Sequence, residues 1–229
     1  MSANAPHDAP TPACYDLIVL DWDGTVMDSL GAIVACARHA LREARLPELS
    51  EELIRGGIGL GLEATVERLL PDLDGEVRRQ WIQAYRDHWI STYQHQPVLL
   101  RGARSAVVEL NHREYMLAVA TGKGRRGLQR DLDELDMDRL FLASRTVDEA
   151  PSKPNPQMLL ELMDELGVRA DRTLMVGDTT YDLDMAKNAG VVSVAVLTGG
   201  HDRQTLTSRD PLACLASLAD LPEWLESSR

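Results

Sequence analysis

The feature that most limits the possible folds is an alternation of strand-like and helix-like patterns after Pro97. Short apolar runs such as 115–120 and 173–176 are separated by amphipathic stretches of helical length. Such alternation favours parallel strands joined by right-handed helical crossovers. The predicted strands are 17–20, 115–120, 141–146, 173–176 and 192–197, and the predicted helices after Pro97 are 102–113, 127–135, 156–167 and 182–189.

The segment between the first strand and Pro97 contains only helical patterns. Apolar residues recur there at helical spacing, and Ser29 and Ser50 can cap two of the helices. The aromatic stripe within 77–93 is expected to pack rather than to bind a ligand. We therefore predict an α/β fold. Its Rossmann-like parallel sheet forms a core of residues 13–28 and 98–229, and residues 29–97 form an inserted α-helical cap.

Composition narrows the possible partners and the location. A net charge of −12 argues against a surface for nucleic acid or an anionic membrane, where a basic patch is usual. No apolar run reaches membrane-spanning length. Residues 1–12 are rich in Ala and Pro and lack a signal-peptide pattern, so we predict a flexible tail. The cysteines Cys14, Cys36 and Cys214 are far apart and are expected to be reduced, which favours a cytoplasmic protein. The sequence indicates no particular oligomeric state.

Two carboxylates follow the first strand directly. Asp21 and Asp23 are spaced by one residue and should point to the same side, whereas Trp22 points away. Two carboxylates in one small volume are tolerated if a cation lies between them or if one is protonated. Gly24 permits a tight turn, and Thr25 can donate to an anion. The structural alternative is a polar turn after a core strand.

Further polar residues follow the ends of other predicted strands. Thr121 and Gly122 follow one strand, Asp178 and Asp182 follow another, and Lys153 precedes a helix. Ligands of open parallel sheets bind at the carboxyl ends of the strands, so these residues should meet there. Each has a structural interpretation when taken alone, such as a helix cap or a surface charge. Together they provide a nucleophile, an acid, a hydroxyl donor, a cation and more carboxylates, which are the groups that phosphoryl transfer needs.

In their order, these motifs resemble those of the haloacid dehalogenase-like hydrolase superfamily. The resemblance is to the phosphoglycolate phosphatase-like group, which has a helical cap after the first strand, and it extends from Tyr15 to about Gly200. The motifs are DWDGT at 21–25, the Thr of TGK at 121, the Lys of KPNP at 153 and GDTTYD at 177–182.

The resemblance implies a role for each motif residue. Asp21 would be the nucleophile and Asp23 the general acid/base, while Thr121 and Lys153 would bind the phosphoryl group. Mg²⁺ would be held by Asp21, the backbone carbonyl of Asp23 and Asp178, and Asp182 would orient Lys153 or water at the metal. The expected activity is hydrolysis of a small phosphate ester through an aspartyl-phosphate. The expected substrate-binding residues are Gly24, Thr25, Gly122 and, beside the glycine-rich turn 56–61 of the cap, Arg55.

Related chemistries fit the sequence less well. Asp23 argues against a dehalogenase, which needs no leaving-group proton, and the absence of lysine from the cap argues against a phosphonatase. Ile33 and Leu62 lie at the approximate positions where mutases of the β-phosphoglucomutase kind carry His and Arg. A mutase or a pyrophosphatase of the same superfamily is the alternative function. A binding protein that keeps the scaffold without turnover is the alternative from another class. Phosphoglycolate, a sugar phosphate, a nucleotide and pyrophosphate are all open as substrates.

Overall fold

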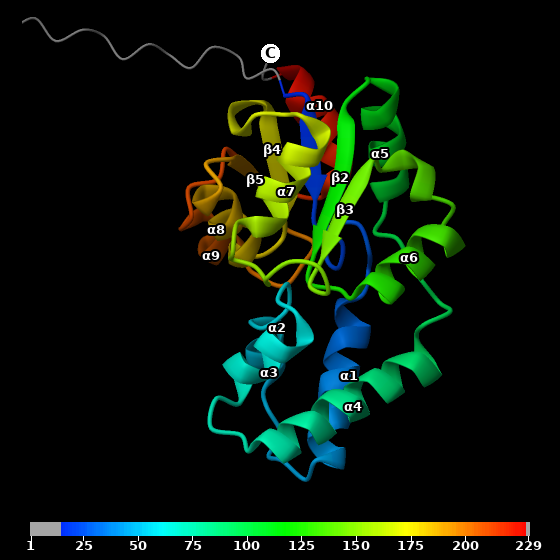
Figure 1. The fold of residues 1–229 in the computed structure, drawn as a ribbon, viewed down its shortest axis with the longest axis vertical. Helices are drawn as coiled ribbons and strands as arrows, with labels where there is room; N and C mark the ends of the chain where they lie inside the picture. Colours follow the sequence, from blue (N-terminus) through cyan, green and yellow to red (C-terminus); the bar gives the residue numbers. More distant parts are fainter. Residues whose placement is uncertain (1–14, 228–229) are drawn as a thin grey trace, which may run out of the picture.

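The centre of the molecule is a six-stranded parallel sheet with the strand order β3-β2-β1-β4-β5-β6 (Figure 1). The computed structural model describes residues 15–227, so the predicted tail 1–12 and Cys14 lie outside the described residues. The predicted α/β fold class is confirmed. The strands are β1 (Leu17–Leu20), β2 (Met116–Thr121), β3 (Ala143–Thr146), β4 (Thr173–Gly177), β5 (Val192–Val196) and β6 (Ala213–Leu215).

Helices cover both faces of the sheet, and this explains why β1 is apolar at every position. Ile18 and Leu20 face a core cluster that includes α5, α6 and α10, whereas Leu17 and Val19 face α7 and α8. The sequence of a parallel strand that is buried on both faces is typically a continuous apolar run. The helices of this domain are α5 (Ala103–His112), α6 (Arg125–Glu134), α7 (Gln157–Leu166), α8 (Thr180–Asn188), α9 (Arg203–Thr207) and α10 (Leu221–Ser227).

The order of the strands brings three strand ends together. In the sheet, Leu20 of β1 lies level with Val119 of β2 and with Val176 of β4. The strand order reverses at β1, because the chain moves to β2 on one side and later to β4 on the other. Such a reversal is where open parallel sheets bind ligands. The residues after β1, β2 and β4 therefore surround one site.

The first four of the five helices between β1 and β2 form a separate layer beyond these strand ends (Figure 1). They have their own apolar cluster, in which Val34, Val66 and Trp81 are buried. The two connections to the sheet run side by side, because the amide of Asp28 donates to the carbonyl of Val98 at 2.8 Å. The helices are α1 (Leu30–Glu43), α2 (Glu51–Arg55), α3 (Leu62–Leu69) and α4 (Gly75–Thr92). The exact division into core and cap stays a prediction.

Local details differ from the sequence-based expectations. Ser50 caps α2 by accepting from the amide of Leu53 at 3.2 Å, as expected. Ser29 precedes α1, but its side chain makes no capping hydrogen bond. The elements β6, α9 and α10 were not predicted. None of the described helices has the length and apolarity of a membrane span.

Candidate active site

Lys153 holds two aspartates together at the end of β1. Its Nζ donates to Asp21 Oδ1 and to Asp182 Oδ1, each at 2.6 Å, and only 1% of the residue is exposed. A buried ammonium group is tolerated when carboxylates pair with it. Burial alone lowers the pKa of Lys153, but the charges of Asp182 and Asp21 outweigh this and hold it above its ordinary value. Lys153 is therefore a fixed cation beside Asp21.

Asp182 is fully engaged by the protein. While its Oδ1 accepts from Lys153, its Oδ2 accepts from the amide and the hydroxyl of Thr179, at 3.0 and 2.7 Å. The contacts with Thr179 form a capping box at the start of α8. Both carboxylate oxygens thus have partners, which fits the predicted role of orienting Lys153.

Asp178 lies beside them, after β4. Its Oδ1 accepts from the Thr25 hydroxyl and its Oδ2 from the Gly200 amide, both at 2.8 Å. Burial, followed by the charge of Asp182, raises the pKa of Asp178 to about 7. Thr25 therefore supports Asp178 in this structure, and its predicted contact with substrate stays a prediction.

The carboxylates fit a hard divalent cation. One oxygen from each of Asp21, Asp178 and Asp182 lies within 4.8 Å of the others. Asp21 Oδ2 is buried and makes no hydrogen bond within residues 15–227. Burial raises the pKa of Asp21, and although Lys153 counteracts this, the charges of Asp182 and Asp178 add to the rise. An all-oxygen set of crowded carboxylates is typical of a magnesium site. Asp21 and Asp178 are the side chains predicted to hold the ion, together with the predicted carbonyl of Asp23, and Asp182 lies next to them.

Gly24 lets the backbone approach these carboxylates closely. Its φ is +90°, and a Cβ atom added there would lie 2.5 Å from Asp178 Oδ2. Any L side chain would be strained by this φ and would also collide with the carboxylate. The Gly24 carbonyl accepts from the Thr198 hydroxyl at 2.7 Å. The glycine of the first motif is thus required by the packing around Asp178, and its predicted contact with substrate stays a prediction.

Asp23 points into a second network, which the sequence-based interpretation missed. Lys123 Nζ lies 3.2 Å from Asp23 Oδ1 and 3.2 Å from Asp131 Oδ2. Trp22, buried below, donates from Nε1 to Asp131 Oδ2 at 3.1 Å. Burial lowers the pKa of Lys123, but the charges of Asp23 and Asp131 outweigh this effect and hold the pKa above its ordinary value. The only signal in the sequence was that Lys123 is one of three lysines and stands in a motif.

Thr121 and Gly122 form the wall at the end of β2. Thr121 is buried, and its hydroxyl accepts from the Lys123 amide at 3.1 Å. Gly122 faces the cap, because a Cβ atom added there would lie 2.5 Å from the Leu60 carbonyl oxygen. The glycine-rich turn 56–61 therefore rests on the loop after β2.

A pocket of about 930 Å³ lies between the cap and the core. Asp21, Asp23 and Thr121 line its floor, and residues of α1, α3 and α4 line its roof. Arg55 does not line it; its Nε donates to Glu51 at 3.0 Å on the surface of α2. The role of Arg55 in specificity stays a prediction, and the position of Arg55 outside the pocket does not support it. The aromatic stripe of α4 is only partly a packing feature, because Tyr85 and Trp89 line the pocket and are half-exposed.

The model of a known family matches residues 18–196, and its description is haloacid dehalogenase-like hydrolase. The chain belongs to the haloacid dehalogenase-like hydrolase family. The resemblance noted from the motifs is confirmed, and within the family the chain is similar to phosphoglycolate phosphatases. It is 28% identical to the phosphoglycolate phosphatase of Vibrio parahaemolyticus, over 90% of this chain and 94% of that relative. It is 32% identical to "Probable phosphatase IndB" of Dickeya dadantii, over 90% of this chain and 91% of that relative.

Solved structures share the fold of this chain. A hydrolase from Pseudomonas syringae superposes with a TM-score of 0.84 at 24% identity, covering 93% of this chain and 98% of the other. A predicted phosphoglycolate phosphatase from Haemophilus somnus gives a TM-score of 0.83 at 24% identity, covering 94% and 99%. The chain thus shares its fold with both solved structures.

Proposed function

We propose that the protein is a Mg²⁺-dependent phosphatase that hydrolyses small phosphate monoesters through an aspartyl-phosphate on Asp21. The observation that carries this proposal is the state of the Asp21 carboxylate. Lys153 holds its Oδ1, while Oδ2 is buried at the floor of the pocket and makes no hydrogen bond to the part of the chain that the structure describes. A carboxylate fixed through one oxygen with the other unengaged is suited to attack phosphorus. The names of the curated relatives point to the same reaction and to phosphoglycolate-like substrates.

Each of these residues has a defined role in the proposed reaction. Asp21 Oδ2 forms a bond to phosphorus as the ester bond breaks, and Asp23 gives a proton to the departing oxygen. Asp23 then takes a proton from water, which attacks the aspartyl-phosphate and releases inorganic phosphate. Lys153 and the Thr121 hydroxyl stabilise the oxygens of the transferring group. When bound, Mg²⁺ offsets the repulsion between the phosphate ester and the carboxylates.

The expected partner is a small phosphate ester. The net charge of −12 supports the prediction that nucleic acid and anionic membranes are not bound. A cytoplasmic location also stays a prediction.

Hydrolysis of p-nitrophenyl phosphate by the full chain tests the proposal. We expect activity with Mg²⁺, loss of activity in excess chelator, and a fall of at least about a thousandfold in kcat for Asp21→Asn. Asp28→Asn is the matched control, since Asp28 is an exposed carboxylate of the same segment and does not line the pocket. Full activity in chelator, or an active Asp21→Asn protein, would contradict the proposal.

A further inference from the structure

The pocket has two chemically different halves. The floor carries the charged groups described above, whereas the roof is formed by apolar and aromatic side chains of the cap, including Ile33, Ile54, Trp81, Tyr85 and Trp89. Its volume of about 930 Å³ is at the upper end of what drug-sized ligands occupy. A glycolate leaving group would fill only a small part of this space. The roof is therefore built for a larger group than the relatives' name implies.

Aromatic rings line the roof outward from Asp23. The Trp89 ring lies over Lys123, with Nζ 4.6 Å from the ring centroid, and Lys123 in turn contacts Asp23. Farther along α4, Tyr85 stacks on Trp81 with ring centroids 5.6 Å apart and an interplanar angle of 25°. A leaving group bonded to phosphorus at Asp21 would extend past Asp23 along these rings. Flat π-surfaces at this spacing are suited to a further stacked ring.

Trp81 adds an unpaired donor to this wall. Only 1% of the residue is exposed, and its Nε1 makes no hydrogen bond within the described chain. A buried indole N–H usually has a partner.

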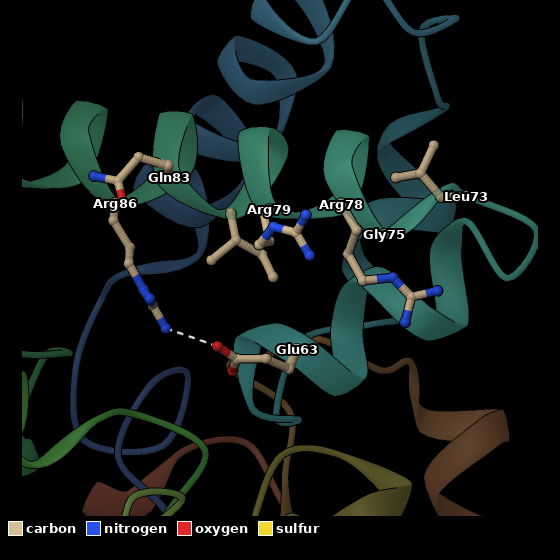
Figure 2. Close-up of a pocket in the computed structure, with 8 residues that line it drawn as sticks. Glu63, Leu73, Gly75, Arg78, Arg79, Gln83 and Arg86 are labelled. Carbon is tan, nitrogen blue, oxygen red and sulfur yellow. Dashed lines mark hydrogen bonds and ion pairs between the residues drawn. The ribbon is translucent and has the colours of Figure 1, made fainter.

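The cation on the cap side of the pocket, Arg86, is already engaged. Arg86 forms an ion pair with Glu63 at 2.7 Å, and both side chains separate this pocket from a smaller one between α3 and α4 (Figure 2). Lys123 is held by Asp23 and Asp131. Arg130, on α6 of the core, donates to the neutral Gln94 side chain at 3.3 Å, and its buried Nε has no partner within the described residues. Arg126, on the core side, is the one pocket-lining cation of residues 15–227 for which no ion pair or hydrogen bond is seen. The roof thus offers rings, but no free cation, to a leaving group.

We propose that the preferred substrate is a phosphate monoester whose alcohol carries an aromatic or heteroaromatic ring, which stacks on Tyr85 and Trp89. This inference rests on the proposed phosphatase function and names its substrate class. The ring is separated from the ester oxygen by a short aliphatic link, because the phosphoryl group must reach Asp21 at the floor. The floor binds the phosphoryl group alike in all esters, and the roof distinguishes between them.

A matched pair of esters tests this inference. Ethyl phosphate and 2-phenylethyl phosphate both release simple primary alcohols, so they differ mainly in the ring. With the Mg²⁺-loaded native chain we expect kcat/KM to be at least about tenfold higher for 2-phenylethyl phosphate. We also expect 2-phosphoglycolate to be hydrolysed less efficiently than 2-phenylethyl phosphate. A ratio near one for the pair, or a preference for 2-phosphoglycolate, overturns the inference and leaves the phosphatase function intact.

Variants of α4 locate the preference. Trp89→Leu and Tyr85→Leu should each lower the ratio of the two kcat/KM values by about threefold or more, whereas Trp89→Phe retains a ring and should preserve most of it. His88→Leu is the matched control, because the His88 ring stacks on His39 at 4.1 Å and does not line the pocket. A double variant of Tyr85 and Trp89 that folds with the native circular dichroism and keeps the native ratio also overturns the inference.

Binding without turnover separates the two proposals. Calorimetric titration of the native chain with ethylphosphonate and with 2-phenylethylphosphonate requires no hydrolysis. We expect at least about tenfold tighter binding of the phenylethyl compound. If no ester is hydrolysed but this difference is present, the proposed function fails and the ring site stands. Equal affinities overturn the ring site whatever the activity.

Discussion

Asp21 and Asp23 are two residues apart in sequence, but their surroundings differ. Asp21 is 1% exposed and pairs with Lys153, whereas the side chain of Asp23 is 16% exposed and lies by Lys123 at the pocket wall. Two carboxylates with different environments can take different roles in one reaction. The buried, fixed carboxylate suits a nucleophile. The more accessible one suits an acid that must reach the leaving oxygen and later a water.

Asp23→Asn should separate these roles. Without the acid, esters of poor leaving groups should lose far more activity than an aryl phosphate, because a phenolate departs without a proton. Hydrolysis of the aspartyl-phosphate should slow for all esters. A stopped-flow experiment with an activated aryl phosphate should therefore show a burst of about one product per enzyme, followed by slow turnover.

Asp21→Asn is the control, since it removes the nucleophile and should give no burst with any ester. The Asn side chain at position 23 keeps the backbone carbonyl, so Mg²⁺ affinity should be retained. If Asp23→Asn lowers the activity toward alkyl and aryl esters equally and gives no burst, the acid/base role belongs to another residue.

Among the elements, those up to β5 could be predicted from sequence, whereas those after β5 could not. The apolar run of β1 and the helix–strand alternation up to β5 were sufficient for the fold class. The segment that contains α9 and β6 was missed because β6 has three residues, all half-buried, and α9 has five. Elements this short carry too few residues to show a period.

The candidate site, too, could be predicted from the sequence only in part. The motif residues Asp21, Lys153, Asp178 and Asp182 were expected to meet, and the structure brings them together. The missed Asp131 belongs to α6 and looks like an ordinary helix-surface carboxylate in sequence. Only the tertiary packing that buries it beside Trp22 and Lys123 distinguishes it from one. The direction of Arg55 likewise depends on its ion pair with Glu51, which its sequence neighbourhood did not reveal.

The loop after β5 is connected to the start of α8 through a neutral histidine. The Thr180 amide donates to His201 Nδ1 at 2.9 Å, and this acceptor is lost when the ring is protonated. Burial lowers the pKa of His201 below its ordinary value of 6.5, although a backbone hydrogen bond at Gly56 and the charge of Asp182 act against this. The other charged groups that act on the ring are Arg68 and Asp202.

We predict that this histidine makes the fold less stable in acid. Because its pKa is lower in the folded state, its contribution is present above pH 6.5 and is lost as the pH falls through the folded-state value. The drop in Tm between pH 7.5 and pH 5.5 should therefore be smaller in His201→Gln than in the native chain. His112→Gln, which changes an exposed histidine of α5, should keep the native drop. Equal drops in the native chain and His201→Gln would contradict the prediction.

Taken as a whole, the cap and the core of the molecule meet at several places, and two of these places differ in kind. One is the pair of connections at Asp28 and Val98. The other is the turn 56–61, where the Gly61 amide donates to Ser152 at 2.9 Å and the Tyr181 hydroxyl donates to the Gly56 carbonyl at 2.6 Å. The second contact is formed by a few polar bonds and can break, whereas the first is covalently continuous. This asymmetry favours a hinge at the connections and closure at the turn, which would exclude water during the reaction.

Gly122→Ala should hold the molecule open. The added methyl group would lie 2.5 Å from the Leu60 carbonyl oxygen and 2.8 Å from that of Gly59, so these backbone atoms must move away. Movement of the cap relieves the collision without disturbing the sheet. We expect the radius of gyration measured by small-angle X-ray scattering to rise, and kcat/KM for p-nitrophenyl phosphate to fall at least about tenfold. The matched control is Gly31→Ala on α1, where an added methyl group meets nothing within 4 Å. It should keep native activity and gain up to about 1 kcal/mol of stability, because alanine favours a helix more than glycine does. A Gly122→Ala protein with native dimensions and native kcat/KM would show that the contact at the turn does not control closure.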